Sequence, residues 1–408
     1  MIGTTLLKFI MKILKTLVMG VGINYKKRMI LLRNRKFIFF QLLSLVLFII
    51  ILYFIISYTI TFKQKFAQHS NSKDYIWLEK HNNLSYFNRY VKKEDSDSRC
   101  ISNAPVITVV ISAPPNFSAR NAVRKSWAKH LPKDWEVLFF VGLATSKDLK
   151  EEIENEKATF EDVIILDVQE SYINLTLKLY LTFYWLHQHC QNSRFLIKVD
   201  DDVFLSPSKI KHLIHCSSLA MDILYDPLAL QKCEETWDVS NLLGYFVDKK
   251  SRKYLSYIIG GYLYKNVKAD RNPYSKWYLS KNLYNSEDLP DFLSGTAYFF
   301  STNLLPYLLK AVSEVPAINL EDLYFTGLVM RKALNLKLSH IKGWNRFRPQ
   351  WDDSCTYSKL VTAHGLSPDE LVHITDKVSN IPNSCSLSAS LFSLFNEMVS
   401  HYIPRYKL

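Results

Sequence analysis

Hydrophobic positions in the middle of the chain fall into short continuous runs, and longer amphipathic stretches separate them. These runs predict four strands: Val106–Ser112, Val137–Val141, Val163–Val168 and Phe195–Val199. The remaining stretches predict helices over residues 118–130, 146–160 and 171–190, and one that begins at Ser206-Pro207. Such alternation indicates an α/β fold, a mostly parallel sheet with helices on both faces. Ligands bind such sheets at the carboxyl ends of the strands.

A longer apolar run, Phe37–Ile60, contains no charged residue. About 20 apolar residues suffice to span a bilayer, and a cleaved signal peptide is shorter. The basic residues directly before the run favour a cytosolic N-terminus. The sequence therefore predicts a single-pass type II membrane protein, with translation starting at either Met1 or Met29. Its parts are a cytosolic tail (1–36), a transmembrane signal anchor (37–60), a polar stem (61–103) and a lumenal domain (104–408).

The net charge of +13 is concentrated near this apolar run. Residues 1–60 contain nine Lys and Arg and no acid, so the rest of the chain is nearly neutral. This distribution argues against binding to nucleic acid. All six cysteines follow the run, where a lumenal setting permits disulfides, and no pairing is assigned. Three glycosylation sequons, at Asn83, Asn116 and Asn174, lie on the same side. Aromatic residues of the stem, Tyr75, Trp77, Tyr86 and Phe87, are expected to dock onto the domain.

Three consecutive carboxylates, Asp200-Asp201-Asp202, end the fourth predicted strand. Crowded carboxylates repel one another unless a cation lies between them, and their oxygens suit Mg²⁺ or Mn²⁺. A solvated acidic turn is the alternative. Because the run ends a buried strand, we favour the metal site. Dinucleotide, P-loop, zinc-protease and serine-hydrolase motifs do not occur in the sequence.

Several blocks of the sequence match, in order, the motifs of one enzyme family. They are Arg120–Trp127, Phe140-Val141-Gly142, Asp167–Lys178, Lys198–Phe204, Lys276-Trp277-Tyr278, Ser294–Ser301, Glu321–Gly327 and His364–Pro368. With these blocks the chain resembles glycosyltransferase family 31, the β-1,3-galactosyltransferase and β-1,3-N-acetylglucosaminyltransferase group. The segments Cys216–Leu243 and Gly260–Asn272 depart from the family pattern.

The resemblance implies a GT-A type, Rossmann-like mixed sheet flanked by helices, and a set of site residues. The implied metal ligands are Asp202, Asp200 and His364. The implied UDP-sugar contacts are Arg120, Arg124, Lys198, Asp200 and Asp201. The implied sugar and acceptor contacts are Trp277, Ser294, Gly295 and Glu321, and the implied catalytic base is Asp322.

Each of these roles has an alternative in the sequence. Arg120 and Arg124 share a helix face and could serve an acidic network at the strand ends instead of a diphosphate. His364 could be a surface-loop histidine. Glu321-Asp322 could cap a helix over residues 323–333, a role compatible with catalysis. For the aromatic candidates, Trp277, Tyr278, Tyr298 and Trp344, core packing competes with sugar stacking.

The implied activity is metal-dependent, inverting transfer of a hexose from a UDP-sugar to a glycan in β-1,3 linkage, in the Golgi membrane. UDP-galactose is the first choice of donor and UDP-N-acetylglucosamine the second. The acceptor would be a glycan on a protein or a lipid. Two other readings stay open: a catalytically idle, membrane-tethered glycan-binding protein of the same fold, and a lumenal phosphohydrolase. The acceptor and the oligomeric state are not predicted.

Overall fold

The structure, a computed structural model, describes residues 103–222, 227–248, 252–349 and 353–379, with Phe87 and a few positions between 46 and 57. The chain divides into two compact units, Met1–Gln68 and His69–Leu408. Most of the predicted span (37–60) and stem (61–103) lies outside the described residues. Within the described part, no helix is both long and apolar enough to cross a membrane.

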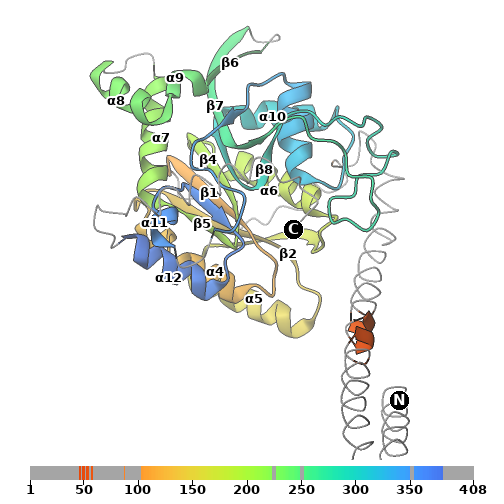
Figure 1. The fold of residues 1–408 in the computed structure, drawn as a ribbon. Helices are drawn as coiled ribbons and strands as arrows, with labels where there is room; N and C mark the ends of the chain where they lie inside the picture. Colours follow the sequence, from red (N-terminus) through yellow and green to blue (C-terminus); the bar gives the residue numbers. More distant parts are fainter. Residues whose placement is uncertain are drawn as a thin grey trace, which may run out of the picture. The chain divides into compact units, whose positions relative to one another are not determined.

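A mixed β-sheet forms the centre of the larger unit (Figure 1). Its strand order is β3 (Val163–Gln169), β2 (Glu136–Leu143), β1 (Val106–Ile111), β4 (Phe195–Asp200), β8 (Phe292–Ser301), β7 (Lys253–Tyr264) and β6 (Leu243–Asp248). The first four strands are parallel to one another, and β8, β7 and β6 continue the sheet with antiparallel pairs. The short strand β9 (Ser339–His340) pairs with β7. The predicted α/β architecture is confirmed, and the sheet is mixed, as the resemblance implies, because its second half is antiparallel.

The four predicted strands are β1 to β4, with ends shifted by at most two residues. The predicted helices are also present: α4 (Phe117–Lys125) with the short η2 (Ala128–His130), α5 (Lys147–Phe160), α6 (Leu175–His189) and α7 (Pro207–Met221). Helix α6 begins four residues later than predicted, because residues 171–174 form a turn. The remaining helices are α8 (Pro227–Trp237), α9 (Val239–Leu242), η3 (Thr302–Leu304), α10 (Leu305–Val312), η4 (Leu323–Ala333), α11 (Ser354–Tyr357) and α12 (Pro368–Ser379).

Two hydrophobic cores cover the two faces of the sheet. Neighbouring residues of a strand belong to different cores, as Val109 and Val110 show, because successive side chains point to opposite faces. One core packs α6, α10 and η4, and the other packs α4, α7 and α12. Phe87 of the predicted stem is buried in the first core against the rings of Tyr180 and Tyr324, so the expected docking of a stem aromatic is confirmed.

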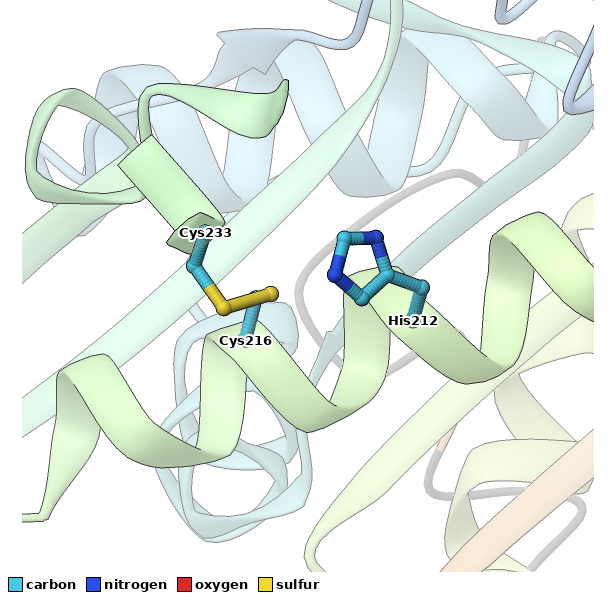
Figure 2. A group of neighbouring side chains, drawn as sticks. All are labelled: His212, Cys216 and Cys233. Carbon is cyan, nitrogen blue, oxygen red and sulfur yellow. A yellow bond between two sulfur atoms is a disulfide. The ribbon is translucent and has the colours of Figure 1, made fainter. Parts of the chain in front are cut away.

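Cys216–Leu243, the first of the two segments that depart from the family pattern, includes the end of α7, helices α8 and α9, and the first residue of β6. A disulfide between Cys216 and Cys233 ties α8 to α7 (Figure 2). His212 lies near the two sulfur atoms, but their disulfide leaves no thiolate for a metal ion. Its Nδ1 accepts a hydrogen bond from Trp237 Nε1. Cys190 and Cys355 are disulfide-bonded as well.

Candidate active site

Chain topology brings His364 beside the aspartates that end β4. After Asp200 the chain turns through Asp201-Asp202 into the short strand β5 (Val203–Leu205). Strand β5 pairs antiparallel with β10 (Thr362–His364), which places His364 opposite Val203. His364 Nε2 therefore lies 3.4 Å from Asp202 Oδ2. Two sequence blocks that are far apart along the chain meet at one strand end.

Asp200, Asp202 and His364 form a cluster that fits a divalent cation. One ligand atom from each residue lies within 4.8 Å of the others. The Oδ1 atom of Asp202 is buried and has no hydrogen-bond partner among the described residues. Burial raises the pKa of Asp202 to about 6, and Asp200 and Asp201 add to this against the opposing effect of His364. A buried, unsatisfied carboxylate oxygen beside an imidazole and another carboxylate is a donor set that Mn²⁺ or Mg²⁺ satisfies.

Asp201 takes part in a different network from its neighbours. Its Oδ2 accepts hydrogen bonds from Ser112 Oγ at 2.6 Å and from Asn116 Nδ2 at 3.0 Å. Burial raises the pKa of Asp201, although these two donors oppose the shift. Asp201 does not belong to the group formed by Asp200, Asp202 and His364, and its carboxylate is instead held by Ser112 and Asn116.

The positions of Arg120 and Arg124 favour an acidic network over the UDP-sugar role that the resemblance implies. Arg120 is fully buried, and its guanidinium donates to both oxygens of Glu156 and to the carbonyls of Ala113 and Pro114. Arg124 donates to Glu156 and to Asp162, each at 2.7 Å. Burial would raise the pKa of Glu156, but the two arginines outweigh it and the pKa is lowered. Both cations thus serve the acidic network that the sequence left as the alternative.

A second pair of acids, Glu321 and Asp322, stands at the start of η4. Asp322 Oδ1 accepts a hydrogen bond from the backbone N–H of Leu323 at 2.8 Å, and its Oδ2 accepts one from Gly295 N–H at 3.1 Å. A Cβ atom on residue 295 would lie 2.6 Å from Glu321 Oε1, so glycine is needed for strand β8 to approach these acids. Asp322 therefore caps the helix and faces the site, the two roles that the sequence predicts together.

Lys198 connects the two acidic groups. Its Nζ donates to Asp200 Oδ1 at 2.6 Å and to the carbonyl of Gly295, and it lies 3.4 Å from Glu321 Oε1. Burial would lower the pKa of Lys198, but the charges of Asp200 and Glu321 outweigh it and raise the pKa. Burial also raises the pKa of Glu321 to about 7, since the charges of Asp322 and Asp200 add to it and Lys198 only partly offsets it.

A cavity of about 420 Å³ opens between the two acidic groups. The following residues predicted for the site line it: Lys198, Asp200, Trp277, Ser294, Gly295, Glu321, Asp322 and His364. Lys276 Nζ lies 4.7 Å from the centre of the Trp277 ring. Tyr298 and Trp344 belong to the core: Tyr298 is fully buried, and Trp344 donates a hydrogen bond to the carbonyl of Ala297. Tyr278 is partly buried and packs against the core.

Sequence reasoning missed Arg346, Arg348 and Tyr264 in this cavity. Segment 345–348 runs beside β10, where the N–H of His364 donates to the carbonyl of Phe347. The Arg346 guanidinium packs over the ring of Tyr264 at 4.8 Å and over that of Phe347 at 3.9 Å. Arginines alternating with aromatics after Trp344 are a weak signal, and the place of the segment becomes clear only from its pairing with β10.

Two predicted sequons lie at helix starts in the described part of the chain. Asn116 precedes α4 and donates to Asp201, and Asn174 precedes α6 and donates to the carbonyl of Gln169 at 3.1 Å. Asn83 lies outside the described residues. Their glycosylation stays a prediction.

Comparisons with known proteins agree on one family. The family model "Galactosyltransferase" matches residues 118–225 and 238–342. The chain is 28% identical over 287 residues to human beta-1,3-galactosyltransferase 1, covering 69% of this chain and 77% of the relative. It is 28% identical over 316 residues to mouse beta-1,3-galactosyltransferase 2, covering 75% and 66%. It is 26% identical over 297 residues to beta-1,3-galactosyltransferase 5 of Pan paniscus, covering 71% and 86%.

Solved structures give weaker likenesses. The galactosyltransferase LgtC in complex with donor and acceptor sugar analogues matches with a TM-score of 0.29 and 11% identity, covering 68% of this chain and 98% of that one. The bifunctional glycosyltransferase WbbM matches with a TM-score of 0.34 and 14% identity, covering 70% and 51%. These scores are too low to support an inference. The family model covers more than half of the chain, and we conclude that the chain belongs to the galactosyltransferase family, glycosyltransferase family 31, and is a hexosyltransferase.

Proposed function

We propose that this protein transfers galactose from UDP-galactose to a glycan acceptor in β-1,3 linkage, with inversion at the transferred sugar. The observation that carries the proposal is a single cavity with a cation-binding group at one end and a tethered carboxylate at the other. The linkage and the sugar are proposed by analogy with the relatives, which are beta-1,3-galactosyltransferases. The mixed sheet is consistent with a GT-A type fold.

At the donor end, Asp200, Asp202 and His364 would hold Mn²⁺ or Mg²⁺. When bound, the cation supplies positive charge that offsets the charge gathering on the departing diphosphate. Arg346 and Arg348 line the same cavity and would serve the diphosphate in place of the buried Arg120 and Arg124. The Arg348 guanidinium also donates to Glu370, so Arg346 is the first choice for this role. Arginine suits this role because its planar guanidinium meets phosphate oxygens in pairs.

At the acceptor end, Asp322 would act as the base. The acceptor hydroxyl oxygen forms a bond to the anomeric carbon while its proton passes to the Asp322 carboxylate. The bond from that carbon to the diphosphate oxygen breaks, and UDP leaves with the electron pair. Inversion requires only this one base, because no covalent sugar–enzyme intermediate forms. The hydrogen bond from Gly295 N–H fixes the carboxylate, and Trp277 offers a ring face for a sugar.

The setting proposed for this chemistry is the Golgi lumen, with residues 37–60 as a type II anchor. The uncharged run and its basic flank support this topology. The disulfide between Cys216 and Cys233 suits an oxidising compartment, since cytosolic thiols are kept reduced.

The test uses the full-length chain purified in detergent. UDP release is measured with Mn²⁺, with Mg²⁺ and with chelator, across a panel of UDP-sugars, with and without galactoside and N-acetylhexosaminide acceptors. Release that requires Mn²⁺ and UDP-galactose and that rises with acceptor supports the proposal, and mass spectrometry of the product identifies the linkage.

The other outcomes point elsewhere. Transfer from UDP-N-acetylglucosamine alone would assign the second donor. A folded protein that binds UDP without transfer would indicate the idle glycan-binding protein, and phosphate release without sugar transfer would indicate a phosphohydrolase.

A further inference from the structure

A second cavity, of about 510 Å³, lies on the other side of the end of strand β7 from the catalytic cavity. Tyr264 lines the catalytic cavity, whereas its neighbours Leu263 and Lys265 line the second one, called here the rear cavity. Successive side chains of an extended chain point to opposite faces. The end of β7 is therefore a wall common to both cavities.

The rear cavity carries an excess of positive charge. Lys265, Arg331 and Lys337 line it, and Asp291 is the one acid among its described lining residues. Two of the cations contact neutral groups: Lys337 Nζ donates to Asn241 Oδ1 at 3.2 Å, and Arg331 Nη1 lies 3.4 Å from Asn335 Oδ1. Arg331 and Lys337 are thus oriented by neutral groups, and no described acid forms a salt bridge with any of the three cations.

Local backbone structure brings Arg331 and Lys337 to the same cavity. Helix η4 ends at a tight turn in which Asn335 has a positive φ of 52°, a conformation that asparagine tolerates better than most residues. In this turn the N–H of Leu336 donates to the carbonyl of Met330. The turn reverses the chain, so Arg331 and Lys337, which are six residues apart, both line the rear cavity.

The floor of the rear cavity includes a buried hydroxyl with an unused hydrogen. Tyr257 is 2% exposed, and its hydroxyl oxygen accepts the backbone N–H of Lys337 at 2.8 Å. No described residue accepts the hydrogen of this hydroxyl. A Cβ atom on Gly244 would lie 2.7 Å from the Tyr257 hydroxyl oxygen, so glycine makes room for it. The exposed ring of Tyr245 stands at the rim. Burying a donor without an acceptor is costly, and a ligand oxygen would relieve that cost.

We propose that the rear cavity binds an anionic group, a sulfate or a carboxylate, on a sugar of the acceptor glycan. Arg331 and Lys337 would meet its oxygens with charge-assisted hydrogen bonds, and the Tyr257 hydroxyl would donate a further one. The Tyr245 ring would cover the apolar face of the sugar. This inference rests on the proposed function, because it extends the acceptor from the catalytic cavity to a second point of attachment.

The first test measures binding to the full-length chain in detergent by calorimetry. The probes are 6-O-sulfated N-acetyllactosamine and 6′-sialyl-N-acetyllactosamine, both with a free 3-hydroxyl on the terminal sugar, and unmodified N-acetyllactosamine is the neutral probe. The double variant Arg331→Gln/Lys337→Gln is expected to bind the preferred anionic probe about tenfold more weakly, since each exposed cation contributes modestly. Its affinity for the neutral probe should not change. Tighter binding of the sulfated or of the sialylated probe identifies the anionic group.

Two further variants keep the test interpretable. Lys332→Gln removes a charge from the next position of the same helix, which lines a different hollow, and should leave all affinities unchanged. Tyr257→Phe keeps the buried ring and removes only the hydroxyl, and should weaken anionic binding about threefold. The proposal is wrong if neither anionic probe binds better than the neutral one, or if the double variant binds them as the wild type does.

Steady-state transfer separates this proposal from the proposed function. With the double variant, KM for the anionic acceptor should rise about tenfold while kcat and the KM for the neutral acceptor stay constant. If the anionic and the neutral acceptor have the same KM in the wild type, and the double variant changes neither value, the rear site is wrong. The proposed transferase activity would still stand. Charge-dependent probe binding without any sugar transfer would support the rear site and contradict the proposed transferase activity.

Discussion

The two acidic groups of the catalytic cavity differ in how their carboxylates are satisfied. At the end of β4, Asp202 has a buried oxygen that no described residue bonds, and its partners are another carboxylate and a histidine. At the start of η4, both oxygens of Asp322 accept backbone N–H groups. The first group offers an unsatisfied carboxylate oxygen to a cation. The second is fixed in place without one.

The two acidic groups are therefore suited to different parts of the transfer reaction. An unsatisfied cluster is suited to bind a charged ligand, whereas a carboxylate that is oriented by its backbone is suited to take a proton from a defined direction. Lys198 lies between them and bonds to both sides. It keeps Asp200 and Glu321 near each other without letting their charges repel.

The largest effect is expected at Asp322, whose carboxylate accepts hydrogen bonds from two backbone N–H groups. Replacing Asp322→Asn removes the proposed base but keeps the size of the side chain, so kcat should fall about 10³-fold. The KM for the UDP-sugar should stay the same, because the donor end is untouched. Stopped assays of product formation check this. Asp288→Asn, an acid in an exposed ion pair, is the matched control and should retain full activity.

The next effect concerns stability. Arg120→Met leaves Glu156 buried beside only Arg124, and the free energy of unfolding should fall by about 3 kcal/mol. The KM for the UDP-sugar should change less than about twofold, because Arg120 lies behind the cavity wall. Chemical denaturation and donor kinetics together check this prediction. A large rise in the donor KM with unchanged stability would restore the diphosphate role of Arg120.

A larger residue at position 295, which would crowd Glu321 and Asp322, should slow catalysis. In Gly295→Ala the new methyl group meets Glu321 Oε1 and the Cβ of Asp322, so kcat should fall about 10- to 100-fold through misplacement of the base. Gly261→Ala is the control, since its methyl group would crowd only β8, 3.1 Å from Tyr298 Cβ. A similar loss of kcat in both variants would show that the effect comes from the sheet and not from the acids.

The smallest effect is a change in pH dependence. The pKa of Glu321 is raised from 4.5 to about 7, so the folded protein holds a proton that the unfolded chain loses in this range. The contribution of Glu321 to stability therefore falls as pH rises from about 4.5 to about 7. Glu321→Gln should remove this fall and be more stable than the wild type at pH 8, by on the order of 2 kcal/mol, with little difference at pH 4.5. Thermal unfolding at the two pH values checks the sign.

The parallel half of the sheet was predictable because its signals are local. Strands β1 to β4 are continuous apolar runs, and the three aspartates directly follow one of them. The antiparallel half was not predictable in this way. The contact of Lys198 with the carbonyl of Gly295 joins residues 97 positions apart, and no local pattern encodes that pairing.

The candidate site residues show the same contrast between local sequence signals and long-range pairing. The resemblance named Asp322 and His364 correctly as residues of one cavity, and the structure brings them there through η4 and β10. For Arg120 and Arg124 the structure favours the acidic partners Glu156 and Asp162, which helix spacing could not identify, because it shows only that two cations share a face. Arg346 was missed for the converse reason: its segment carries no motif, and only its place beside β10 puts it in the cavity.

The division between the two acidic groups is tested most directly by calorimetric titration of the full-length protein with UDP in the presence of Mn²⁺. The account predicts that Asp322→Asn binds UDP with the wild-type Kd, whereas Asp202→Ala binds it at least about tenfold more weakly and shows no dependence on Mn²⁺. Equal losses of affinity in the two variants, or Mn²⁺-dependent binding that survives in Asp202→Ala, would contradict it.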